Sequence, residues 1–83
     1  MDQIARTPKQ LGTVLRRRRK EVGLSQEALA SSIRLRQATI SALETSATDT
    51  RLDTVFDALA ALDLELVVRR RTKGSAREIE GLF

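Results

Sequence analysis

Residues 23–44, GLSQEALASSIRLRQATISALE, carry more information about the fold than the rest of this chain. The stretch contains two short helical patterns, each too brief to be stable alone, separated by a tight polar corner. The second pattern runs from about residue 37 to residue 44 and places Ile40 and Leu43 on its inward side. It also leaves the side chains of Gln37, Thr39 and Ser41 largely free. Two short helices joined in this way need further helices to complete a core.

A helix is predicted before this stretch, with a clear start and a clear stop. The Thr7 hydroxyl can accept a hydrogen bond from a free amide, and Pro8 lies where no donor is needed. Gln10 can reach back to complete the cap. Gly23 can take the left-handed conformation that ends the helix. The expected apolar stripe comprises Leu11, Val14, Leu15 and Val22.

The other helices follow the same apolar spacing. In the central stretch, Ser25 should cap a helix that buries Ala28, Leu29 and Ile33. After the loop TSATDT, Thr50 and Asp53 should form the capping pair of a later helix. The expected inward side of that helix comprises Leu52, Val55, Phe56, Leu59, Ala60 and Leu62.

Residues 64–69, LELVVR, change to the alternation of a β-strand, with Leu64, Leu66 and Val68 on one side. A lone strand cannot satisfy its own backbone, so we expect it to pair with its copy across a two-fold axis. The predicted fold is mainly α, with four to five helices and one C-terminal β-strand that pairs across a homodimer. Residues 1–69 would form this domain, and residues 70–83 a flexible basic tail.

The amino-acid composition limits the classes of function that this chain can have. The 83 residues allow one small core, and the net charge of +4 favours polyanions as partners. The absence of cysteine and histidine excludes disulfides, zinc fingers and imidazole chemistry, and we expect no metal, no cofactor and no enzymatic activity. The aromatics, Phe56 and Phe83, are too few for single-strand stacking, which favours duplex DNA. Without a long apolar run, we expect no membrane association and a cytoplasmic, nucleoid-associated protein.

Two short helices with a tight corner and polar residues at the start of the second are typical of a helix-turn-helix. The Gln37 amide offers a donor and an acceptor on one short arm, which suits adenine in the major groove. Ala38 is small enough to allow close approach. The predicted base-contacting residues are Gln37, Ala38, Thr39 and Ser41. The alternative is that these are solvated polar residues on an ordinary surface helix.

Phosphate contacts are expected around the same motif. Arg34 and Arg36 flank the entry to the second helix, and Gln26 starts the first, where the helix dipole favours an anion. The run from Arg16 to Lys20 cannot face one duplex, because successive residues turn by about 100°. We expect Arg18 to extend along the apolar stripe. The predicted phosphate-contacting residues are Ser25, Gln26, Arg34, Arg36 and Arg17.

GLSQEALA followed by ATISALE, after a basic first helix, resembles the Cro/C1-type (Xre) helix-turn-helix repressors over about residues 11–62. Within that family, the chain is most similar to the HipB-type antitoxins, through TPKQLGTVLRRRRKEVGLSQ, RQATIS and LDTVFDALAALDLELVV. The resemblance implies an ion pair between Arg19 and Glu44. It also implies a homodimer that binds operator DNA, represses its own operon and binds a HipA-type Ser/Thr kinase toxin.

Two alternatives stay open. The chain could be a stand-alone Xre-type repressor or restriction-system controller without a toxin partner. The basic cluster Arg69, Arg70, Arg71 and Lys73 could protect a strand edge or contact a partner or flanking DNA. The family pattern gives no use for Leu82 and Phe83 at the end of the tail, and the loop TSATDT departs from the glycine and basic residues of many repressors.

Overall fold

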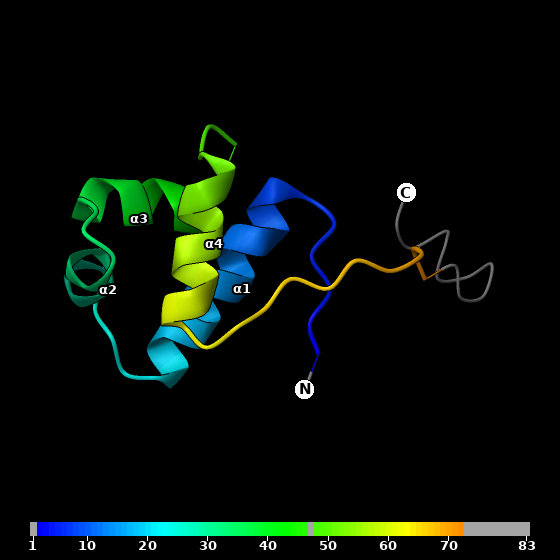
Figure 1. The fold of residues 1–83 in the computed structure, drawn as a ribbon, viewed down its shortest axis with the longest axis horizontal. Coiled ribbons are helices and arrows are strands. Elements are labelled where there is room, and N and C mark those ends of the chain that lie inside the picture. Colours follow the sequence, from blue (N-terminus) through cyan, green and yellow to red (C-terminus); the bar gives the residue numbers. More distant parts are fainter. Residues whose placement is uncertain (1, 47, 73–83) are drawn as a thin grey trace.

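The computed structural model describes residues 2–46 and 48–72, which form four α-helices (Figure 1). These are α1 (Pro8–Glu21), α2 (Gln26–Ser32), α3 (Gln37–Thr45) and α4 (Leu52–Ala61). The predicted mainly α fold is therefore confirmed, with four helices. Among the described residues no β-strand is formed, and none of these helices is long and apolar enough to cross a membrane.

Helix α1 begins and ends where the sequence predicts. The Gln10 amide donates to Thr7 Oγ1 at 3.0 Å, and Gln10 Oε1 accepts from the Arg6 amide at 2.6 Å. Gly23 adopts φ +78°, in the left-handed region that favours glycine. Val22 lies at the C-cap and is 41 % exposed, so its predicted place in the apolar stripe is wrong.

Helices α2 and α3 are joined by a short turn whose conformation was not predicted. Ser25 Oγ caps α2 by accepting from the Ala28 amide at 3.0 Å. In the turn, Arg34 adopts φ +58°, and the Leu35 amide donates to the Ala30 carbonyl at 2.8 Å. This left-handed residue reverses the chain so that α3 can leave at an angle to α2 (Figure 1).

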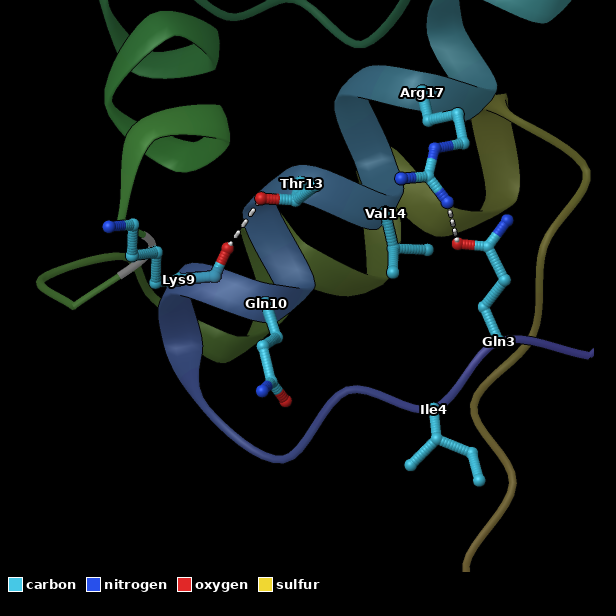
Figure 2. Close-up of a pocket in the computed structure, with 7 residues that line it drawn as sticks. All are labelled: Gln3, Ile4, Lys9, Gln10, Thr13, Val14 and Arg17. Carbon is cyan, nitrogen blue, oxygen red and sulfur yellow. Dashed lines mark hydrogen bonds between the residues drawn. The ribbon is translucent and has the colours of Figure 1, made fainter. Parts of the chain in front are cut away.

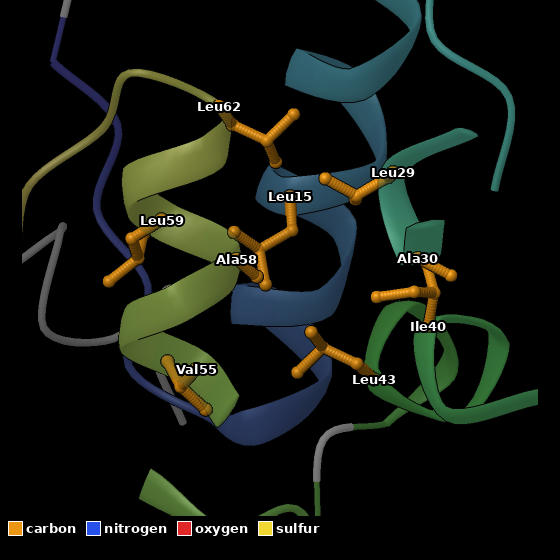
Figure 3. Close-up of a cluster of buried hydrophobic side chains, with 9 residues drawn as sticks. All are labelled: Leu15, Leu29, Ala30, Ile40, Leu43, Val55, Ala58, Leu59 and Leu62. Carbon is orange, nitrogen blue, oxygen red and sulfur yellow. The ribbon is translucent and has the colours of Figure 1, made fainter. Parts of the chain in front are cut away.

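The core is built from all four helices (Figure 3). Ala30 is buried and Ala28 is exposed, which corrects the predicted inward side of α2. Helix α2 has only seven residues, and its buried face consists of Leu29 and Ala30. Ile33, at the C-cap, is half-buried beside them. The buried apolar residues are Leu15, Leu29, Ala30, Ile40, Leu43, Val55, Ala58, Leu59 and Leu62.

Helix α4 differs most from the prediction. Leu52 is 69 % exposed, Phe56 is 46 % exposed and Ala60 is also exposed, because these residues share an i, i+4 row that faces away from the core. Ala58 is buried instead. The row containing Val55, Leu59 and Leu62 packs inward as expected.

The predicted Thr50–Asp53 cap of α4 is wrong. The N-cap residue is Arg51, and its side chain makes no capping hydrogen bond. The Asp53 carboxylate instead accepts from Arg51 Nη2 at 3.0 Å, in an exposed ion pair. Such a pair contributes little to stability.

After α4 the chain runs as an extension, residues 63–72, that crosses the N-terminal arm, residues 2–6 (Figure 1). Arg6 Nη2 donates to the Thr72 carbonyl at 3.3 Å. Leu64 is half-buried against the core, and the side chains after it are exposed. Pairing of Leu64, Leu66 and Val68 across a dimer is not shown and stays a prediction. Lys73, Leu82 and Phe83 lie outside the described residues.

Helices α1 and α3 meet at Gly12, a contact that the sequence pattern did not predict. A Cβ atom at Gly12 would lie 2.6 Å from the carbonyl oxygens of both Leu43 and Glu44. Those oxygens belong to the backbone of α3 and cannot rotate aside. Only glycine allows this close approach.

We predict that Gly12→Ala lowers the free energy of unfolding by about 1–3 kcal/mol, because the methyl group forces the two helices apart. Alanine normally stabilises a helix relative to glycine, so the sign of the change is diagnostic. Urea denaturation followed by circular dichroism measures it. Arg16→Ala, at an exposed position of α1, is the control and should change stability little. A Gly12→Ala variant as stable as the parent chain would contradict the packing described.

The left-handed conformation of Arg34 should have a measurable effect on stability. A non-glycine residue in the left-handed region carries a conformational cost, so Arg34→Gly should be more stable than Arg34→Ala by about 1 kcal/mol. Both variants lose the same side chain, so their difference isolates the backbone. Thermal and urea unfolding of the pair measure it. Equal stability, or a more stable alanine variant, would show that the turn is not left-handed in solution.

Candidate nucleic-acid interface

The first turns of α3 present the residues predicted to read bases. Gln37 is the first residue of α3 and is exposed, as is Ala38. Thr39 and Ser41 are half-buried and not largely free as expected, because they flank the inward face of α3. Ala42, one turn beyond Ala38, is also exposed and was missed. The i, i+4 spacing from Ala38 could have identified it. The outward surface of α3 is therefore narrow and made of small side chains, with one longer amide at its N-terminal end.

Gln37 is hydrogen-bonded to Gln26, the first residue of α2, which we expected to bind phosphate. Gln37 Nε2 donates to Gln26 Oε1 at 3.4 Å, and Gln26 Nε2 donates to Glu44 Oε1 at 3.1 Å. Glu44 thus fixes which way the Gln26 amide points, and Gln26 holds Gln37 in turn. The Gln37 carbonyl oxygen and one of its amide hydrogens stay available, which is the pair of groups that adenine requires.

A buried ion pair anchors this chain of contacts. Arg19 Nε donates to Glu44 Oε2 at 2.6 Å and Arg19 Nη2 donates to Glu44 Oε1 at 3.0 Å, while Nη1 donates to the Leu24 carbonyl at 2.8 Å. Arg19 is 8 % exposed and Glu44 is 6 % exposed. The hydrogen bond with Glu44 raises the pKa of Arg19 above its ordinary value, against the effect of burial. The guanidinium therefore stays charged and holds α1 against the last turn of α3.

These contacts form a connected group, which we call the anchor network: Arg19, Glu44, Gln26 and Gln37. It runs from the buried side of α1 to the exposed start of α3. Its two ends were predicted separately, the ion pair from the family resemblance and Gln37 from the helix-turn-helix motif. The connection between these two ends was not predicted, because the position of Gln26 between them depends on the angle between α2 and α3.

The basic residues divide into two groups. Arg34 and Arg36 are exposed and flank the start of α3. Arg17 instead donates from Nη1 to Gln3 Oε1 at 3.3 Å, on the N-terminal arm (Figure 2). Since Arg17 and Arg19 are two residues apart, they project about 200° from each other around α1. The structure therefore separates Arg17 from the anchor network.

The arm and α1 enclose an open pocket beside Arg17 (Figure 2). Its volume is about 370 Å³. The pocket is lined by Gln3, Ile4, Lys9, Gln10, Thr13, Val14 and Arg17. It lies on the side of α1 that carries Arg17, away from the exposed start of α3.

We predict that Arg19→Met is strongly destabilising, by about 3–5 kcal/mol, because it leaves the Glu44 carboxylate buried without its partner. The double variant Arg19→Met, Glu44→Met should recover much of that loss, because no unpaired charge is left. Urea denaturation of the two single variants and the double variant measures the coupling. Simple additivity of the two single losses would contradict a buried, mutually dependent pair.

Comparisons with known proteins agree with this geometry. A family model described as helix-turn-helix matches residues 15–68, whereas comparison with curated protein sequences finds no match. A solved HipB variant in complex with an O2 20-mer has a TM-score of 0.81 and 32 % identity, covering 87 % of this chain and 100 % of that one. A HipA–HipB–O2–O3 complex has a TM-score of 0.79 and 32 % identity, covering 86 % and 100 %. The chain therefore belongs to the Cro/C1-type helix-turn-helix family, as the sequence predicted, and within it is similar to the HipB antitoxins.

Proposed function

We propose that this chain is a sequence-specific transcriptional repressor that acts as the antitoxin of a type II toxin–antitoxin system. As a homodimer, it represses its own operon at the nucleoid and binds a HipA-type Ser/Thr kinase toxin. The observation that carries the DNA-binding part is the exposed Gln37 amide at the start of α3, oriented through Gln26 by a buried ion pair. The family membership supports the same conclusion.

In this proposal α3 lies in the major groove and reads base edges. Gln37 binds adenine through one amide hydrogen and its carbonyl oxygen. Ala38 allows close approach and contacts a thymine methyl group, and Thr39 and Ser41 bind a base or a phosphate with their hydroxyl groups. The small exposed side chains of α3 favour such an approach, because nothing bulky separates the helix from the base edges.

Phosphate contacts on either side of α3 hold the domain on the duplex. Arg34 and Arg36 bind DNA phosphates from the turn, and Ser25 and Gln26 bind DNA phosphates from the start of α2. Gln26 retains one amide hydrogen for this contact besides the one given to Glu44. Arg17 contributes only if it leaves the N-terminal arm. Each neutralised phosphate should steepen the loss of affinity with rising salt.

The extension is the proposed dimerisation element. Leu66, Val67 and Val68 are 55 %, 68 % and 90 % exposed, and the described part of a single chain offers this segment no sheet partner. Strand pairing with a second copy, with Leu64, Leu66 and Val68 on one face, would cover them and satisfy the backbone. Sedimentation equilibrium should give twice the mass of the chain. A monomer at all concentrations would contradict this part of the proposal.

The toxin partner is supported by the similarity to a HipB that was solved together with HipA. A pull-down of the tagged chain with the product of any neighbouring kinase gene tests it. Binding that inhibits the kinase activity would support the antitoxin role. Failure to bind would leave a stand-alone Xre-type repressor or restriction-system controller, with the same DNA-binding surface.

We predict that Gln37→Ala weakens binding to the cognate duplex by about 1–3 kcal/mol and relaxes base choice at one position of each half-site. The physical reason is the loss of a bidentate contact to one base. The cognate site is first selected from random duplexes with the unmodified chain, and mobility-shift titrations then compare variants on it. Thr13→Ala, at an exposed position of α1 whose hydroxyl donates to the Lys9 carbonyl of the same helix, is the control. An equal loss on cognate and unrelated DNA would mean that Gln37 does not read sequence.

A further inference from the structure

Two adjacent arginines of α1 hold two different parts of the molecule. Arg19 holds α3 through Glu44, as described above. Arg18 points about 100° away around the helix and donates from Nε to the Leu62 carbonyl at 2.9 Å. Leu62 is the C-cap of α4. Residues 62–64, where the extension begins, are called the root of the extension. One turn of α1 therefore contacts both the recognition helix and the root of the extension.

The root of the extension has a defined direction. Leu62 is buried, Asp63 turns the chain at φ +57°, and the Leu64 amide donates back to the Leu59 carbonyl at 2.8 Å. The Leu62 carbonyl is one of the groups that a helix end leaves without an intrahelical partner, and a cation is favourable there. Arg18 supplies both the donor and the charge.

Arg18 is itself held in place from its own helix. Its Nη1 lies 3.5 Å from Glu21 Oε2, one turn further along α1. Its side chain is only 32 % exposed, so the aliphatic part packs while the guanidinium bridges α1 and α4. This partial exposure agrees with the prediction that Arg18 extends along the apolar stripe. That prediction did not reveal that the charged end binds a specific carbonyl.

We infer that Arg18 is a positioning residue that fixes the direction of the extension relative to α3 and thereby sets the spacing between operator half-sites. This inference rests on the proposed function, a dimer paired through the extension. In such a dimer, the two extensions join the subunits, so the relative position of the two α3 helices depends on how each extension leaves its own domain. The distance and angle between these helices depend on how firmly each root is held to α1.

The preferred spacing between half-sites depends strongly on the distance and angle between the two α3 helices. One added base pair moves a half-site by about 3.4 Å along the duplex and rotates it by about 35°. A rigid dimer cannot follow both changes and keep both α3 helices in the groove. A dimer with loosened roots can follow them, at the cost of affinity for the correct spacing.

The test compares Arg18→Met with Arg16→Met. Methionine keeps the apolar stem and removes the donor and charge, and Arg16 is an exposed arginine of the same helix, so the control loses the same charge. Both are titrated on the selected operator and on duplexes with the half-sites one base pair closer or further apart. The unmodified chain and Arg16→Met should prefer the correct spacing by at least about tenfold, and Arg18→Met by less than about threefold.

Base discrimination within a half-site, tested by a substitution opposite Gln37, should be unchanged in Arg18→Met, which separates positioning from general damage. Should Arg18→Met fail to fold by circular dichroism, Arg18→Lys, which keeps the charge but donates from a different position, takes its place. Full spacing preference in the Arg18 variant, or an equal loss on all three spacings, would overturn the inference. If the unmodified chain binds single half-sites as a monomer, the proposed dimer fails and the inference with it.

Discussion

The buried ion pair between Arg19 and Glu44 holds α1 against α3 and is the contact from which the recognition surface is oriented. Burying two charges is costly, and the cost is offset here because the pair is bidentate and a third guanidinium bond reaches the Leu24 carbonyl. The glycine contact at Gly12 brings α1 close enough to α3 for the pair to form. The pair therefore specifies how the two helices sit more than it adds to stability.

The buried ion pair also orients side chains at the surface of the helix-turn-helix. Glu44 accepts from Gln26, and Gln26 accepts from Gln37, so the exposed amide at the start of α3 is partly ordered before any ligand arrives. Ordering a long side chain on binding lowers affinity, and ordering it in advance removes part of that cost. A buried ion pair can thus favour sequence recognition although neither of its charges faces the solvent.

Much of the fold could be predicted from the sequence because its signals are local. The caps at Thr7 and Ser25 and the stop at Gly23 depend on a few neighbouring residues. The exposed side of α4 could not be predicted, because its apolar residues occupy two adjacent rows and only packing against the core residues of the other helices selects one. The Gln26 contacts also depend on tertiary geometry. A strand that pairs between two chains cannot form within one chain, so its test must come from the dimer.

DNA recognition as proposed requires the N-terminal end of α3 to enter the major groove of a duplex. Heteronuclear NMR of the isotope-labelled chain, titrated with the selected operator, tests it most directly. If α3 enters the groove in this way, the largest shift changes should fall on the side-chain amides of Gln37 and Gln26 and on the backbone amides of residues 36–41. Changes confined to α4 or the extension, with those amides unmoved, would contradict it.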